Sequence, residues 1–150
     1  MRIVLQRVAA ASVEINDKIH ANIGNGLVLL LGIENDDTNE DVEWLCRKIT
    51  SMRIFSDQEG KMNLSVSDIN GEVLIISQFT LHASTKKGNR PSFIRAAKPD
   101  IAIPLYEMFV SCLSSMMSGS VKSGVFGADM KVGLVNDGPV TIVIDTKMKE

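Results

Sequence analysis

Long hydrophobic runs are missing from this sequence, and their absence argues against a membrane-spanning helix. No stretch reaches the roughly 18 consecutive apolar residues that a bilayer span requires. Near the N-terminus, Gln6 and Arg7 interrupt the apolar residues too early for the core of a signal peptide. We therefore expect a cytoplasmic protein without a membrane partner.

Residues that bind metals or form disulfides are also scarce. The chain has two cysteines and two histidines. Cys46 and Cys112 fall on the apolar faces of expected helices, which is typical of buried free thiols. His20 and His82 belong to no Cys/His or HExxH pattern. We therefore expect neither a disulfide nor a metal site.

A large positive charge is absent as well. The net charge of −2 argues against a protein that coats nucleic acid, and no DNA partner is expected. One segment, STKKGNRPSFIRAAKP at residues 84–99, is nevertheless basic, and we call it the basic segment. Its charged residues are Lys86, Lys87, Arg90, Arg95 and Lys98. With a single aromatic ring it suits contact with a polynucleotide backbone better than base stacking; the alternative is an ordinary solvated loop.

What the sequence does contain is enough apolar material for one domain spanning residues 1–150. Hydrophobic residues make up 45% and charged residues 23%, as in ordinary globular proteins. Helices are expected from Thr38, with Asp41 at a capping-box spacing, and from Pro99. Strands are expected at 2–8, 11–15, 18–23, 27–33, 52–55 and 72–81, an ordered polar loop at 56–71, and two or three strands between 121 and 145. This order predicts an α/β fold with mixed strands in one or two layered sheets and helices on one side.

The polar end of the expected strand 72–81 is the first candidate for chemistry. Ser77 or Thr80 could attack an acyl carbon, but a hydroxyl nucleophile needs a positioned base, and His82 is the only histidine nearby in sequence. On a regular strand, Ser77 and Phe79 face one side while Gln78, Thr80 and His82 face the other. We therefore expect main-chain groups of this segment to matter as much as its side chains.

Two glycine-containing segments near the C-terminus are further candidates. SGVFGADMKV, residues 123–132, surrounds Phe126 and Met130 with small residues that permit close approach to a ligand or another chain; tight strand packing is the alternative. NDGPVT, residues 136–141, interrupts an apolar strand with Gly138 and Pro139. Taken alone, it is most simply interpreted as a hairpin turn.

Six segments, taken together and in order, resemble the D-aminoacyl-tRNA deacylase family. They are MRIVLQRV, RIFSDQEGKMN, SQFTL, KKGNRPSF, FGADM and NDGPVT. The resemblance covers the chain from Met1 to about Asp145. It implies a homodimeric editing hydrolase that cleaves the ester of D-aminoacyl-tRNA, and of mischarged glycyl-tRNA, to free amino acid and tRNA. It also implies a β/β/α arrangement of layered sheets, and no metal or organic cofactor.

The resemblance further implies roles for individual residues. The SQFTL motif places the catalytic segment at Ser77, Gln78, Phe79 and Thr80. A Gly-cis-Pro motif corresponds to Gly138 and Pro139, which would enter the pocket of the other subunit, with Arg7 holding them in place. Remaining assignments are Phe126 and Met130 for substrate selection and Lys86, Lys87, Arg90 and Arg95 for tRNA. The ribose 2′-OH of the substrate, rather than Thr80, would assist the reaction.

Steric exclusion is the physical basis of the chiral selection that the resemblance implies. A methyl group in an apolar pocket contributes only about 1–3 kcal/mol to discrimination, so attraction alone separates enantiomers poorly. A rigid wall that refuses an L side chain cannot refuse glycine, which has no side chain. Accepting glycine is therefore a consequence of rejecting L-amino acids by exclusion.

One departure and two alternatives remain at this stage. Ser84 stands where the family usually has aspartate, and the lost carboxylate bears on loop conformation or tRNA preference. The chain could instead be a non-catalytic module that binds tRNA or protein through the basic segment. A general serine or threonine esterase is the other alternative, although the sequence has neither a GxSxG elbow nor an evident triad.

Overall fold

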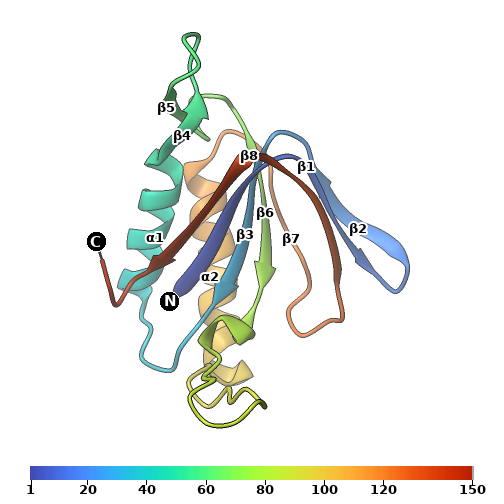
Figure 1. Ribbon diagram of the computed structural model, residues 1–150, viewed down its shortest axis with the longest axis vertical. Coiled ribbons are helices and arrows are strands. Elements are labelled where there is room, and N and C mark those ends of the chain that lie inside the picture. The colour runs from blue at the N-terminus through green and yellow to red at the C-terminus, as the bar shows by residue number, and fades with distance from the viewer. Residues whose placement is uncertain (150) are drawn as a thin grey trace.

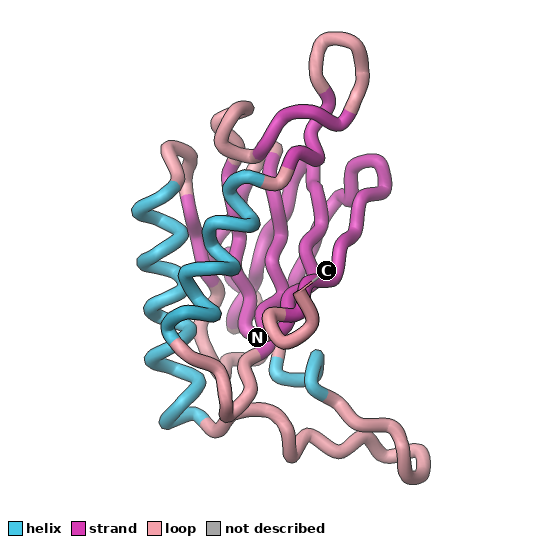
Figure 2. Tube along the Cα trace, turned by 90° about the vertical axis from the view of Figure 1, so that its left-hand side faces the viewer, coloured by secondary structure: helices cyan, strands magenta, loops and turns pink. Residues whose placement is uncertain are grey.

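Two helices pack against one face of a curved sheet in the computed structural model, which describes residues 1–149 (Figures 1 and 2). The elements in chain order are β1 (Arg2–Ile15), β2 (Lys18–Ile23), β3 (Gly26–Gly32), α1 (Asn39–Ser51), β4 (Arg53–Ser56), β5 (Met62–Ser65), β6 (Glu72–Ser77), the 3₁₀ turn η1 (Phe79–His82), α2 (Pro99–Met116), β7 (Val121–Ser123) and β8 (Lys131–Asp145). The predicted mixed α/β fold with helices on one side is confirmed.

The main sheet has six strands, in the order β2-β1-β3-β6-β7, with β8 pairing with β1. β1 runs antiparallel to β2, β3 and β8, whereas β3, β6 and β7 are parallel to one another. β3 lies between β1 and β6, and six of its seven residues are buried. This confirms the central strand predicted from its continuous apolar run.

β1 is a single long strand rather than the two strands predicted. Its first half pairs with β3, from Arg2 opposite Gly32 to Val8 opposite Gly26, and its second half pairs with β2. β8 follows β1 along both halves. The sheet curls along β1, and the pairing with β8 shifts register between Gln6 and Val8 and between Val8 and Ala10 (Figure 1).

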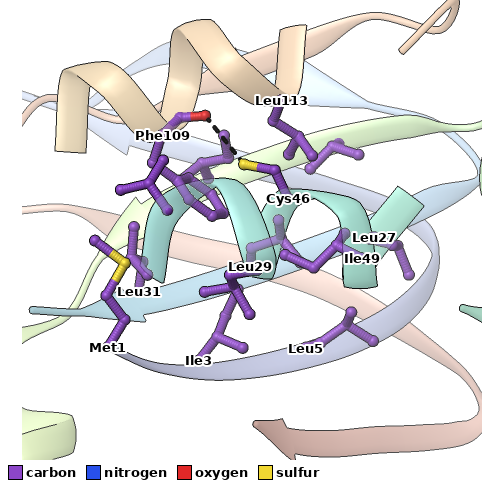
Figure 3. Packing of buried hydrophobic residues seen from close by; sticks show 14 of the residues in the cluster. Met1, Ile3, Leu5, Leu27, Leu29, Leu31, Cys46, Ile49, Phe109 and Leu113 are labelled. Carbon is purple, nitrogen blue, oxygen red and sulfur yellow. Dashed lines mark hydrogen bonds between the residues drawn. The ribbon is translucent and has the colours of Figure 1, made fainter. Parts of the chain in front are cut away.

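Apolar residues on both faces of the sheet explain this layered arrangement. Alternate residues of β1 and β3 point toward the helices, where they meet Cys46, Ile49, Phe109 and Leu113 (Figure 3). A second cluster on the opposite face joins Val8, Ala11, Val13, Ile23, Val28, Leu74 and Ile76. β3 and β6 thus form the middle layer between the helices and the curled end of the sheet.

Helix α1 begins as the sequence predicted. Thr38 is its N-cap, and the backbone N–H of Thr38 donates to Asp41 Oδ2 at 2.9 Å in a capping box. Both cysteines are free, but only Cys46 is buried as predicted, whereas Cys112 is half-buried. Burial raises the pKa of the Cys46 thiol above its usual range. No helix among residues 1–149 is long and apolar enough to cross a membrane.

Two other predictions about local structure were wrong. Residues 56–71 do not form only a loop, because β5 pairs with β4 as a two-stranded hairpin apart from the main sheet. The strand predicted at 72–81 ends at Ser77, and the chain then turns through η1. This turn removes the period-two alternation expected between Ser77 and His82.

Candidate functional site

A pocket of about 310 Å³ opens where the parallel strands β3 and β6 end. Sheet and turn residues line one side, and the start of α2 and the segment after β7 line the other. The lining residues are Leu31, Ile33, Ile76, Ser77, Gln78, Phe79, Ala97, Ala102, Phe126, Gly127, Ala128, Asp129, Met130 and Val132. Ligands commonly bind beyond the carboxyl ends of parallel strands, where loops rather than helices cover the sheet.

The turn η1 presents its backbone beside this pocket. Phe79 and Thr80 are its first two residues, so their N–H groups have no carbonyl partner within the turn. Across the part of the chain that the structure describes, no backbone or side-chain hydrogen bond uses either N–H group as a donor. These two N–H groups are therefore free to bind a ligand oxygen.

The side chains around η1 do not supply the general base that Thr80 would need to act as a nucleophile. Thr80 Oγ1 accepts a hydrogen bond from Gln78 Nε2 at 2.5 Å. His82 is fully buried, and its Nδ1 lies 3.3 Å from Glu34 Oε1 rather than near the hydroxyl of Thr80. An amide donor cannot take the proton of a threonine hydroxyl, so this arrangement provides no general base for Thr80.

The segment after β7 contributes the opposite wall of the pocket. Phe126 and Met130 both line it, as does the carboxylate-bearing residue Asp129, which the sequence did not single out. A Cβ on Gly124 would lie 2.5 Å from Met130 Sδ, so glycine allows the methionine to pack close to the backbone. The Gly124 N–H donates to Ile75 O at 2.9 Å, which ties this wall to β6.

Gly138 and Pro139 lie in an outward bulge of β8, not in a hairpin turn. From Gln6 to Val8 of β1, the paired residues of β8 change from Thr141 to Asn136, so β8 carries extra residues at this point. The Gly138–Pro139 peptide bond is cis, and both residues are exposed. We call residues 137–139 the corner.

Arg7 occupies the β1 position opposite this bulge and holds the corner. Its Nε donates to Asp137 O at 3.0 Å, and its Nη1 donates to Ile54 O at 2.6 Å. The guanidinium carbon also lies 5.9 Å from the centre of the Phe55 ring. Arg7 is only 7% exposed, so one buried cation joins β1, the β4-β5 hairpin and the corner.

The corner and the turn η1 are contacted by side chains from different positions of β1. Arg2, at the start of β1, donates from Nη1 to Leu81 O in η1 at 2.8 Å. Arg7, five residues later, contacts the corner. At about 3.3 Å per residue, the backbone positions of Arg2 and Arg7 are separated by roughly 17 Å along β1. The corner does not line the pocket of its own chain.

The basic segment extends away from η1 (Figure 2). Lys86, Lys87 and Arg90 are exposed, and none of them forms an ion pair within residues 1–149. Arg95 differs, because its Nη2 lies 2.6 Å from Glu34 Oε1. The rings of Phe79 and Phe93 meet edge to face with centroids 5.1 Å apart, so the segment also contacts the pocket.

The structure therefore brings together some of the predicted residues and separates others. Ser77, Gln78, Phe79, Phe126 and Met130 share one pocket, with Thr80 beside it. The corner and Arg7 lie elsewhere, as described above. Glu34, which contacts both His82 and Arg95, was not predicted as a site residue because no local motif marks it.

No cluster of three or more His, Cys, Asp or Glu side chains suited to a metal ion occurs within residues 1–149. The polar groups at the pocket are instead backbone amides, the Gln78 amide, the Ser77 and Thr80 hydroxyls and the Asp129 carboxylate. Such a set can orient an ester and polarise its carbonyl by hydrogen bonding.

Comparisons with known proteins cover nearly the whole chain. A family model described as D-Tyr-tRNA(Tyr) deacylase matches residues 4–145. A protein of Flavobacterium psychrophilum is 60% identical over all of both chains, and one of Cytophaga hutchinsonii is 63% identical over 98% of each; both are named D-aminoacyl-tRNA deacylase.

Two solved structures share the fold. One, titled c-Myc DNA Unwinding Element Binding Protein, superposes with a TM-score of 0.92 at 41% identity and covers 97% of this chain and 98% of its own. The other, titled as a probable eukaryotic D-amino acid tRNA deacylase, has a TM-score of 0.81 at 20% identity, covering 95% of this chain and 97% of its own. At that identity the second likeness concerns the fold alone.

Proposed function

The chain belongs to the D-aminoacyl-tRNA deacylase family, and from this premise we propose that it hydrolyses the ester of D-aminoacyl-tRNA to free amino acid and tRNA. The observation that carries the proposal is the pocket at the end of β6, beside which the N–H groups of Phe79 and Thr80 are unpaired. An acyl-transfer enzyme needs such donors where negative charge develops on the carbonyl oxygen.

The backbone of η1 is the oxyanion-binding element in this mechanism. The N–H groups of Phe79 and Thr80 would polarise the acyl carbonyl, and Gln78, hydrogen-bonded to Thr80 Oγ1, would hold that hydroxyl in place. Because Thr80 has no base, the attacking oxygen would come from water aided by the ribose 2′-OH of the substrate. The aminoacyl group would lie against the apolar wall that includes Phe126 and Met130.

Chiral selection would require a second copy of the chain. The corner is exposed and does not line the pocket of its own chain, so it would serve such a pocket only in a partner subunit. In that position Gly138 and Pro139 would form the wall that refuses an L side chain. Glycyl-tRNA would remain a substrate, because glycine presents nothing to exclude.

The surface around the corner suits a homodimer. β8 pairs with β1 alone among the described strands, so its outer edge is open. Val135 and Val143 are 60% and 63% exposed on this strand, on either side of the corner. Apolar side chains beside an open strand edge are features that a partner chain commonly covers.

The basic segment would contact the tRNA. Lys86, Lys87 and Arg90 are exposed and free of acidic partners in the described chain, which leaves them available to phosphate. Ser84, in place of the family's usual aspartate, pairs with Ser92 through two backbone hydrogen bonds of 2.8 and 2.9 Å. The two ends of the loop between Ser84 and Ser92 are therefore joined by backbone hydrogen bonds, without the carboxylate that the family usually has at position 84.

A single substrate series tests the proposed function. The purified protein is incubated with D-aminoacyl, L-aminoacyl and glycyl forms of one tRNA, and release of free amino acid is measured. Rapid release from the D and glycyl forms, with the L form left intact, is expected. Equal release from D and L forms would refute exclusion, and no release from any form would favour a tRNA-binding module without catalysis.

A further inference from the structure

We propose that Glu34 and His82 are positioning residues that fix η1, and that Arg95 connects this pair to the basic segment. This inference rests on the proposed function, because it concerns how the N–H groups of Phe79 and Thr80 are held. Glu34 lies just beyond the end of β3, His82 ends η1, and Arg95 lies near the end of the basic segment. A carboxylate thus contacts both the turn and the segment.

The imidazole of His82 is enclosed where β3 ends. His82 is 0% exposed, and a Cβ on Gly32 would lie 3.0 Å from its Nε2 and Cδ2. Gly32 and Glu34 are two residues apart, so in extended chain they face the same side. Glycine makes room for the ring, and Glu34 Oε1 lies 3.3 Å from its Nδ1, although neither ring nitrogen forms a hydrogen bond among the described residues. The last residue of η1 is therefore enclosed by shape, with a carboxylate as the polar group beside its Nδ1.

The same carboxylate oxygen is shared with the basic segment. Glu34 Oε1 lies 2.6 Å from Arg95 Nη2 and 3.3 Å from His82 Nδ1. The Glu34 side chain is 11% exposed, whereas that of Arg95 is 60% exposed. Glu34 is therefore largely buried, and its arginine partner is accessible from solvent. The backbone supports this placement, because the Ala97 N–H donates to Ile33 O at 2.8 Å.

Sharing one oxygen makes the two contacts competitive. A nucleic-acid phosphate that engages Arg95 would draw the guanidinium away and leave Glu34 Oε1 to His82 alone. The contact that fixes η1 would then tighten when the basic segment is occupied. Placement of a catalytic donor matters steeply, since a misplacement of about 1 Å can reduce the rate by roughly a hundredfold.

Steady-state kinetics of full-length variants on D-aminoacyl-tRNA test the positioning role. Glu34→Gln and His82→Leu are expected to lower kcat by roughly tenfold to a hundredfold with little change in KM. His82→Gln, which keeps an N–H donor, should recover part of the loss. The double variant Glu34→Gln/His82→Leu should be no slower than the worse single variant, because both remove the same contact.

Two control variants distinguish the positioning role of Glu34 and His82 from the general effect of removing a charged side chain. Glu43→Gln removes an exposed carboxylate paired with Arg47 and should leave both constants unchanged. Arg90→Ala removes a basic-segment charge that does not contact Glu34 and should raise KM without lowering kcat. If Glu34→Gln behaves like either control, or if the losses of Glu34→Gln and His82→Leu multiply in the double variant, the positioning role is refuted.

A substrate without phosphate tests the link through Arg95. On the D-aminoacyl ester of adenosine, Arg95→Met is expected to turn over faster than the wild type, because Glu34 then binds His82 without competition. Arg47→Met, which removes an exposed guanidinium paired with Glu43 on α1, should match the wild type on this ester. An Arg95→Met rate at or below that of the wild type would refute the competition. These outcomes differ from a failure of the proposed function, in which the wild type would release no amino acid from D-aminoacyl-tRNA.

Discussion

At the scale of single residues, Thr80 is the clearest test of mechanism. Its hydroxyl accepts a hydrogen bond from Gln78 and, within residues 1–149, has no histidine or carboxylate as partner. We predict that Thr80→Ala loses less than about tenfold in kcat, because the backbone N–H of residue 80 remains, whereas loss of a true nucleophile costs on the order of 10⁴-fold or more. Single-turnover deacylation measures the effect, with Ser114→Ala on the exposed side of α2 as the control.

The opposite result would have a clear meaning. If Thr80→Ala abolished turnover while tRNA binding and melting temperature stayed unchanged, the hydroxyl itself would act on the substrate. The backbone-centred mechanism would then be wrong, and a search for the missing base would follow.

Arg7 supports a second prediction, about stability and activity together. The guanidinium donates to two carbonyls in different elements, Ile54 O and Asp137 O, which a lysine ammonium at one point cannot reproduce. We predict that Arg7→Lys lowers the free energy of unfolding by about 1.5–3 kcal/mol. Urea denaturation measures this loss.

Activity should fall further than this loss of stability explains, because Arg7 holds the corner. Deacylation assayed at 15 °C, where the variant stays folded, separates the two effects. Wild-type rates from folded Arg7→Lys would contradict a role for Arg7 in placing the corner.

Which residues the sequence reveals depends on whether their partners are local. The candidate segment Ser77–Thr80 could be proposed from the sequence because its polar residues follow an apolar strand directly. Glu34 was missed because its partners, His82 and Arg95, lie far along the chain and meet it only through the path of η1 and the basic segment. The predicted regular strand also placed Thr80 and His82 on the same side, an alternation that the turn η1 removes.

At the scale of elements, the cap of α1 yields a prediction about acid stability. Burial opposes ionisation of Asp41, but hydrogen bonds from Thr146 and Thr38 and the charge of Lys147 outweigh it and lower the Asp41 pKa to about 2. A lowered folded-state pKa stabilises the fold above the unfolded value of 3.8 and loses that stabilisation as pH falls toward about 2.

Asp41→Asn should therefore remove part of the acid sensitivity. We expect the difference in unfolding free energy between wild type and variant to be constant from pH 7 to about 5 and to shrink between about pH 4 and 2. Denaturation at a series of pH values measures it. A difference that does not change with pH would show that the Asp41 charge contributes nothing to the cap.

Elements with strong periodic signals were predictable, and the others were not. α1 and β3 were found from helical spacing and from a continuous apolar run. The β4-β5 hairpin was missed because β5 is mostly exposed and its polar residues carry no alternating pattern. β1 was divided in two because Ala9 and Ala10 are exposed where the strand changes partners, which interrupts the pattern of burial without breaking the strand.

At the scale of the whole molecule, the prediction concerns assembly. Val135 lies exposed on β8 near the corner. We predict that Val135→Lys shifts the protein toward monomer in size-exclusion chromatography and lowers deacylation at dilute concentration, because a charge would enter the proposed interface. Ile19→Lys, which changes a 57% exposed side chain on β2, is the matched control and should leave both measurements unchanged.

Full activity in a stable monomer would contradict the shared site. Composition and periodicity could not predict the proposed dimer, since a valine on an edge strand gives the same sequence signal whether or not a partner chain covers it. Only the resemblance suggested a partner. The position of the corner, far from its own pocket, adds a geometric reason.

β1 also sets a limit on where the chain tolerates a change in length. Arg2 binds η1 and Arg7 binds the corner, and the five steps between them place the two side chains on opposite faces of the strand. One added residue between them would turn one arginine to the wrong face and lengthen the spacing by about 3.3 Å. The tip of the β4-β5 hairpin, residues 58–60, is exposed and does not set the spacing between two contacts. We therefore expect the hairpin tip to tolerate labels and inserted peptides. An insertion between Arg2 and Arg7 of β1 should not be tolerated, because the number of residues between them determines both contacts.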